Sequence, residues 1–105
     1  MSAVLGRSTD PVVGQRMEIE GRFYLKGAPT DPVIVRCLVR SPHGEMITLT
    51  YPDEELERRE LGWYEASVIV DAPGTWAARF EGAGTVDAVQ ETTFNVTASS
   101  VVQAM

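Results

Sequence analysis

Hydrophobic and polar side chains alternate along most of this chain, so that every second residue is apolar. Because successive side chains of a β-strand point to opposite faces of its sheet, this period predicts half-buried strands. The clearest example is the segment 16–26, whose apolar face is expected to comprise Met17, Ile19, Gly21, Phe23 and Leu25. The same pattern predicts strands over residues 33–40, 45–51, 62–70, 75–80 and 86–96.

The strand predicted over residues 33–40 carries apolar side chains on both of its faces. This composition predicts a central strand whose second face is partly covered. The first face holds Val33, Val35, Cys37 and Val39, and the second holds Ile34, Arg36, Leu38 and Arg40.

The predicted strands are joined mainly by short turns rich in proline and glycine, such as Ser-Pro-His-Gly at 41–44. Short strands with such spacing favour an all-β, immunoglobulin-like (Ig-like) β-sandwich of about seven strands over residues 14–96. Residues 1–13 are then an N-terminal arm, and 97–105 are a C-terminal tail. Ile47 and Tyr51 are expected to point inward in their strand. The inward faces are centred on Phe23, Val35, Val39, Leu49, Tyr64, Val68, Trp76, Phe80 and Phe94.

Residues 53–62 interrupt the alternation with a run of glutamates, leucines and arginines. These residues are good helix formers, so one exposed helical turn and an irregular excursion are both compatible with the sequence. Because long non-strand segments and chain ends often carry contacts, both are candidate sites for binding a partner. The candidates are Asp53, Glu54, Glu57 and Arg58 in this segment, and Val101 and Val102 in the tail.

Trp63 is a further candidate for partner contact, because it points away from Tyr64 along the same predicted strand. If Tyr64 is buried, then Trp63 faces outward. Its indole covers the edge of its own sheet, packs under the 53–62 segment, or contacts a partner.

The net charge of −6 is unevenly distributed. Residues 1–44 hold six basic and four acidic side chains, whereas 45–91 hold three basic and eleven acidic ones. Nucleic-acid binding requires a basic footprint, which is not present, so we expect no nucleic-acid partner. No apolar run reaches the roughly 20 residues that span a bilayer, so we expect no membrane insertion either.

Few residues in this chain are suited to catalysis or to metal binding. The histidine, His43, belongs to a predicted turn, and the cysteine, Cys37, lies on an apolar strand face as a small core residue. Zinc sites need more Cys and His ligands than these two. The acidic cluster at 53–57 lacks the glycine-containing loop of an EF-hand. We therefore expect no catalytic, cofactor-binding or metal-binding residue, and no enzyme.

Four motifs in this order resemble small Ig-like structural proteins of tailed bacteriophages and prophages, over about residues 14–96. They are Gly27-x-Pro29-Thr30-Asp31-Pro32, Ser41-Pro42-His43-Gly44, Gly62-x-Tyr64-x-Ala66, and Pro73-Gly74-Thr75-Trp76 followed by Phe80-Glu81-Gly82. The resemblance implies a non-enzymatic virion component, either a capsid decoration protein or a neck or tail subunit. It would be made in the bacterial cytoplasm and would bind other virion proteins in many copies.

The alternative is a carbohydrate- or cell-surface-binding Ig-like module. Trp63 and the acidic 53–62 segment motivate this second hypothesis, because exposed aromatic rings can form a platform for a sugar.

Overall fold

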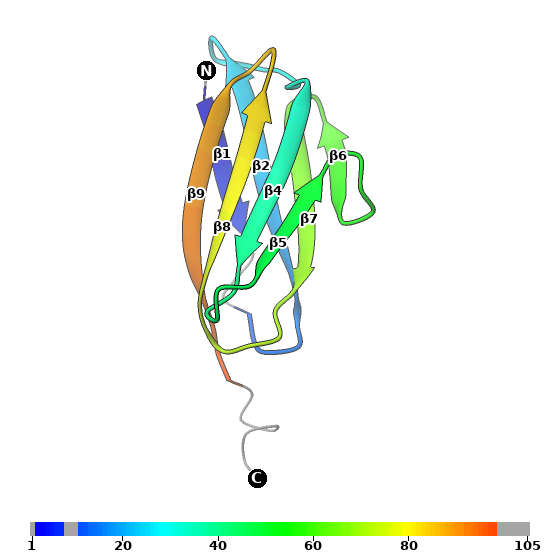
Figure 1. Ribbon diagram of the computed structural model, residues 1–105. Coiled ribbons are helices and arrows are strands. Elements are labelled where there is room, and N and C mark those ends of the chain that lie inside the picture. The colour runs from blue at the N-terminus through cyan, green and yellow to red at the C-terminus, as the bar shows by residue number, and fades with distance from the viewer. Residues whose placement is uncertain (1, 8–10, 99–105) are drawn as a thin grey trace.

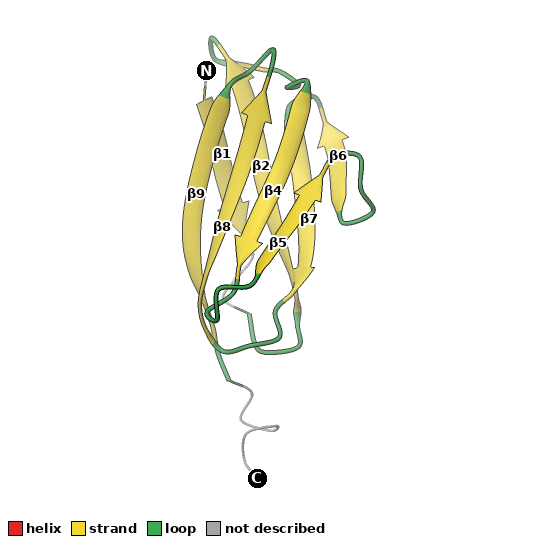
Figure 2. Ribbon diagram, in the orientation of Figure 1, coloured by secondary structure: helices red, strands yellow, loops and turns green. Residues whose placement is uncertain are grey.

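The computed structural model describes residues 2–7 and 11–98, which form two packed antiparallel β-sheets (Figure 1). The first sheet contains β1 (Ser2–Arg7), β2 (Arg16–Leu25), β7 (Trp63–Ile69) and β6 (Leu56–Glu60) in that order, with β3 (Ala28–Pro29) paired to β2. The second sheet contains β5 (Met46–Thr50), β4 (Ile34–Arg40), β8 (Gly74–Ala83) and β9 (Ala88–Val96). No described residue is helical (Figure 2), so no described helix could cross a membrane.

The order of the strands is that of an immunoglobulin sandwich. The path β1-β2-β7-β6 corresponds to the immunoglobulin strands A-B-E-D, and β9-β8-β4-β5 corresponds to G-F-C-C′. The predicted Ig-like fold class is therefore confirmed. The structure has more strands than predicted, because β1, the two-residue β3 and β6 are added to the strands that the alternation identifies.

The core lies between the sheets and consists of the side chains that the alternation places inward. Every residue of the predicted sandwich centre, from Phe23 to Phe94, is at most 8% exposed. Phe23 meets Tyr64 and Phe80 edge-on at ring-centroid distances of 5.9 and 6.3 Å. Cys37 is fully buried, and this burial raises the pKa of its thiol to about 12, which confirms it as a core residue.

Three residues predicted to point inward are instead exposed. Val33 is 74% exposed because it precedes β4 rather than lying within it. Ile47 and Tyr51 are 36% and 39% exposed, because β5 is an edge strand that lies at the margin of the core. The ring of Tyr51 still packs edge-on against Tyr64 at 5.3 Å.

The segment 53–62 is neither a helical turn nor an irregular excursion. Leu56 is 1% exposed and anchors β6, which forms a hairpin with β7. A tight turn precedes it, in which Leu56 N donates to Asp53 O at 3.1 Å. The helix-forming composition is overridden here because pairing with β7 satisfies the backbone and buries Leu56.

The N-terminal segment also differs from the prediction. The pattern predicts an arm over 1–13, whereas Ser2–Arg7 forms β1 and pairs with β2 in the register Ser2↔Tyr24 to Arg7↔Ile19. Val12 then forms a parallel bridge to Thr97 at the end of β9. The predicted contact residues Val101 and Val102 lie outside the described residues.

Candidate interaction surface

The second sheet presents a solvent-facing side that combines apolar and charged side chains. Val35, Cys37 and Val39 point into the core, so the residues between them in β4 point outward. The predicted central strand with partial cover is confirmed, since β4 lies between β5 and β8 and Leu38 is half-buried on this side. Ile34 is 50% exposed, and Met46 of the neighbouring β5 is 49% exposed. We call this side the open face, and its members are Ile34, Arg36, Leu38, Arg40, Met46, Ala77, Arg79, Glu81, Val89 and Glu91.

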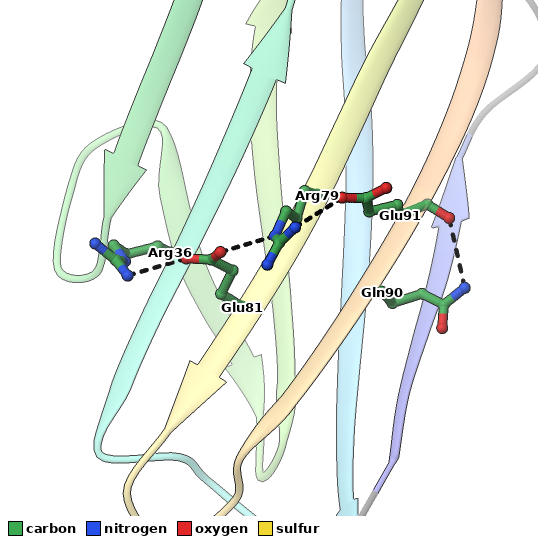
Figure 3. Close-up of polar contacts among 5 residues, drawn as sticks. All are labelled: Arg36, Arg79, Glu81, Gln90 and Glu91. Carbon is green, nitrogen blue, oxygen red and sulfur yellow. Dashed lines mark hydrogen bonds and ion pairs between the residues drawn. The ribbon is translucent and has the colours of Figure 1, made fainter.

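Charged groups of β4, β8 and β9 form a continuous row across the open face (Figure 3). Arg36 pairs with Glu81 at 3.0 Å, and the same carboxylate accepts from Arg79 Nε at 2.7 Å. Arg79 Nη1 in turn donates to Glu91 at 2.8 Å. The hydrogen bond to Glu91 is the main cause that raises the pKa of Arg79 above its ordinary value. We call these four residues the charge row.

A shallow depression of about 400 Å³ lies beside the charge row. Its lining combines the apolar side chains of Leu38, Met46 and Ala77 with the charged side chains of Arg40, Arg79 and Glu91. Arg40 of β4 lies between Met46 of β5 and Ala77 of β8. Methionine and arginine, both present in this lining, are residue types enriched at protein interfaces.

On the opposite sheet, the predicted contact residues of segment 53–62 are held mainly by partners within the chain. Asp53 accepts from Glu55 N at 2.9 Å, which caps the turn before β6. Glu57 pairs with Arg59 at 3.5 Å, and Glu54 is exposed beside them. The neighbouring depression, about 240 Å³, is lined largely by carboxylates, and the described residues contain no group of His, Cys, Asp and Glu that could hold a metal.

Arg58, the remaining candidate in that segment, has a structural role. It donates to Asp31 Oδ2 at 3.0 Å, while Gly62 N and Tyr64 Oη donate to Asp31 Oδ1 at 2.7 and 3.2 Å. Partial burial alone would raise the pKa of Asp31, but the hydrogen bonds from Arg58 and Gly62 outweigh it and lower that pKa. Burial raises the pKa of Tyr64 to about 12, so its hydroxyl stays protonated and donates. This cluster fastens the β6–β7 hairpin to the loop before β4.

Trp63 faces outward, as predicted, but its indole is engaged within its own sheet. Its Nε1 donates to Glu20 at 3.1 Å, and the Arg22 guanidinium lies 4.3 Å from the ring centroid. This geometry matches the expectation that Trp63 covers its own sheet. The ring is half-buried rather than presented as an open platform.

The structure does not bring the sequence candidates together with the open face. Asp53, Glu54, Glu57, Arg58 and Trp63 belong to β6, β7 and their turns, whereas the charge row belongs to the other sheet. Sequence alternation places Arg36 and Arg79 outward. It does not reveal that both contact Glu81, because that contact depends on the pairing of β4 with β8.

No protein-family model and no curated protein sequence matches the chain. Among the solved structures that share its fold are those of two bacterial proteins. Chitinase ChiW from Paenibacillus sp. str. FPU-7, described as a cell-surface-expressed multi-modular enzyme machinery, matches 90% of this chain with a TM-score of 0.62 and 15% identity. A DUF4785 family protein from Legionella pneumophila matches 92% of it with a TM-score of 0.66 and 13% identity.

This chain spans only a small part of either protein, 8% of the chitinase chain and 28% of the DUF4785 chain. Neither is described as a virion protein, so the resemblance to phage proteins gains no support from them. Likeness at such low identity concerns the fold alone. The chain is thus a small all-β, two-sheet sandwich similar in fold to parts of these two larger bacterial proteins.

Proposed function

We propose that this chain is a non-enzymatic binding module that recognises a protein surface through the open face. The observation that carries this proposal is the depression beside the charge row, where Leu38, Met46 and Ala77 adjoin Arg79 and Glu91. An apolar patch beside ordered charges can both exclude water and fix the orientation of a protein partner.

The fold comparison supports a role at the cell surface. A part of the chitinase ChiW has this fold, and that protein is described as cell-surface-expressed and multi-modular. By analogy, we infer that the present chain serves as an accessory module of a cell-surface assembly. The contact of Arg22 and Glu20 with Trp63 favours a protein partner over a sugar, because a sugar would compete with these groups for the indole.

Site-specific photo-crosslinking would test the proposal. A photoreactive amino acid replaces Met46 on the open face or, as a matched control, Ile69 on β7, which is 51% exposed on the opposite sheet. In the cells that produce the protein, irradiation should give a discrete protein adduct from position 46 and none from 69. Equal adducts at both positions, or none at either, would overturn the assignment of the open face.

A carbohydrate-retention assay distinguishes a protein ligand from a carbohydrate ligand. The purified chain is passed over chitin and over peptidoglycan, together with the Trp63→Ala variant. We expect no retention of either protein. Retention that is lost on Trp63→Ala would contradict the protein-binding proposal and favour the carbohydrate-binding alternative.

A virion structural protein is the second candidate. It rests on the order of the four motifs in the sequence, which the structure locates at the turns and strand entries around β4, β7 and β8. Purified phage particles from the source would contain the chain in many copies if this candidate is correct. Its absence from such particles would eliminate the virion role and leave the cell-surface role standing.

A further inference from the structure

The charge row has an order of signs that is complementary to itself. Read from β4 across β8 to β9, its groups are Arg36, Glu81, Arg79 and Glu91, which is positive, negative, positive, negative (Figure 3). When such a row is turned end for end and placed against a copy of itself, every positive group meets a negative one. A row with this order therefore recognises a second identical row.

We propose that the partner of the open face is a second copy of this chain, bound as a symmetric homodimer. This inference rests on the proposed function, since it names the protein that the open face contacts. The two-fold axis lies between the two faces and runs perpendicular to the charge row, because this rotation turns the row end for end.

The same axis also aligns the apolar side chains. Leu38, Met46 and Ala77 lie on one flank of the charge row together with Arg40, and Ile34 and Val89 lie on the other. Rotation about an axis perpendicular to the row keeps each flank opposite the same flank of the partner. Met46, which is 49% exposed, then faces the partner's copy of its own flank, where Leu38 and Ala77 supply apolar contacts and Arg40 lies beside them.

The size of the face predicts a weak dimer. The ten residues of β8 and the four-strand width of the sheet give a face of about 34 by 15 Å, or roughly 1,000 Å² for both copies together. This is near the lower limit for a specific interface. The ion pairs of the charge row are partly exposed, so association should also weaken as salt screens them.

Reversal of the whole charge row tests this arrangement. The variant Arg36→Glu/Glu81→Arg/Arg79→Glu/Glu91→Arg keeps every ion pair within the chain and keeps the row self-complementary. Sedimentation velocity should therefore show that wild type and this variant each dimerise. Their mixture should give no heterodimer by native mass spectrometry, because each row would then meet like charges.

Two further variants complete the experiment. Arg36→Glu alone breaks the order of signs and should lower the association constant of the dimer at least tenfold. Swapping Arg59 and Glu65, an ion pair at 2.6 Å on the opposite sheet, should leave dimerisation unchanged. Thermal unfolding of each variant verifies that it is folded. The salt dependence of wild-type dimerisation is a further test that requires no variant.

The outcomes separate this inference from the proposed function. A wild type that is monomeric at all concentrations, or that forms heterodimers freely with the reversed row, overturns the homodimer. If position 46 still crosslinks to a different protein in cells, the proposed function stands without it. If neither dimer nor adduct forms, both fail.

Discussion

Phe80 packs directly onto the backbone of Gly21 across the two sheets. A Cβ built on Gly21 would lie 2.6 Å from Phe80 Cγ, closer than real side chains approach. Phe80 is fully buried, and Gly21 lies in β2 between the buried residues Ile19 and Phe23. The missing side chain of this glycine thus makes room for the ring and helps to set the spacing of the sheets.

Gly21→Ala should therefore destabilise the fold by about 1–3 kcal/mol, because the new methyl group overpacks the core. Urea denaturation measures this loss. The double variant Gly21→Ala/Phe80→Leu should lose less than the two single changes together, since a smaller side chain at 80 relieves the clash. Strict additivity of the two changes would contradict the proposed contact.

Trp76→Ala should cost about 3–5 kcal/mol, because it leaves a cavity in the core. Trp76 is 1% exposed and stacks on Phe94 with a ring-centroid distance of 6.3 Å. Its Nε1 donates to Ala72 O at 2.9 Å. Trp76→Phe keeps much of the packing and loses the hydrogen bond, so it serves as the milder control. A loss of unfolding free energy below about 1 kcal/mol for Trp76→Ala, measured by denaturation, would contradict the inward orientation of Trp76 in β8.

Asp31→Asn should destabilise the protein by about 1 kcal/mol at neutral pH, because it removes the charge that Arg58 and Gly62 contact. The pKa of Asp31 is lowered on folding. Its stabilising contribution is therefore present above the unfolded pKa of about 3.9 and is lost as pH falls through the lowered value.

Urea midpoints measured from neutral pH down into this acid range should show wild type and Asp31→Asn converging. The exposed turn residue Asp71 supplies the matched control, Asp71→Asn. A difference between wild type and Asp31→Asn that stays constant with pH would exclude the ionised carboxylate as the source of the stabilisation.

The exposed charges of β6 should protect that edge strand from pairing with other chains. Glu57 and Arg59 are exposed on this edge, and charged side chains are a common way to prevent edge-to-edge aggregation. Glu57→Val/Arg59→Val should therefore cause concentration-dependent light scattering. Glu57→Gln/Arg59→Gln keeps the edge polar and should scatter much less; equal scattering by both would point to the lost ion pair instead.

The fold was predictable because its core strands alternate cleanly. In β2, β7 and β8 every second residue is buried, so period two identifies both the strands and their inward faces. The alternation fails in β6, where Leu56 is buried and the next four residues are all exposed. Such a strand depends on its partner β7, and nothing local in the sequence records that pairing.

The candidate surface was less predictable for the same reason. The outward direction of Arg36 and Arg79 follows from alternation, but their common contact with Glu81 follows from the register of β4 against β8. Trp63 illustrates the opposite case. Its outward direction was predictable, yet the Arg22 and Glu20 contacts that occupy its indole come from β2, some 40 positions earlier in the chain.

The bridge between Val12 and Thr97 bears on how this sandwich would carry mechanical load. β1 begins at one end of the sandwich, and β9 ends at the other (Figure 1). Val13 N donates to Thr97 O and Thr97 N donates to Pro11 O, both at 3.0 Å, in a parallel pair. A pull on the two ends of the chain acts along these strands, so it shears these bonds together instead of opening them one by one. A module anchored in series on a surface would resist tension through this bridge and through the pairing of β1 with β2.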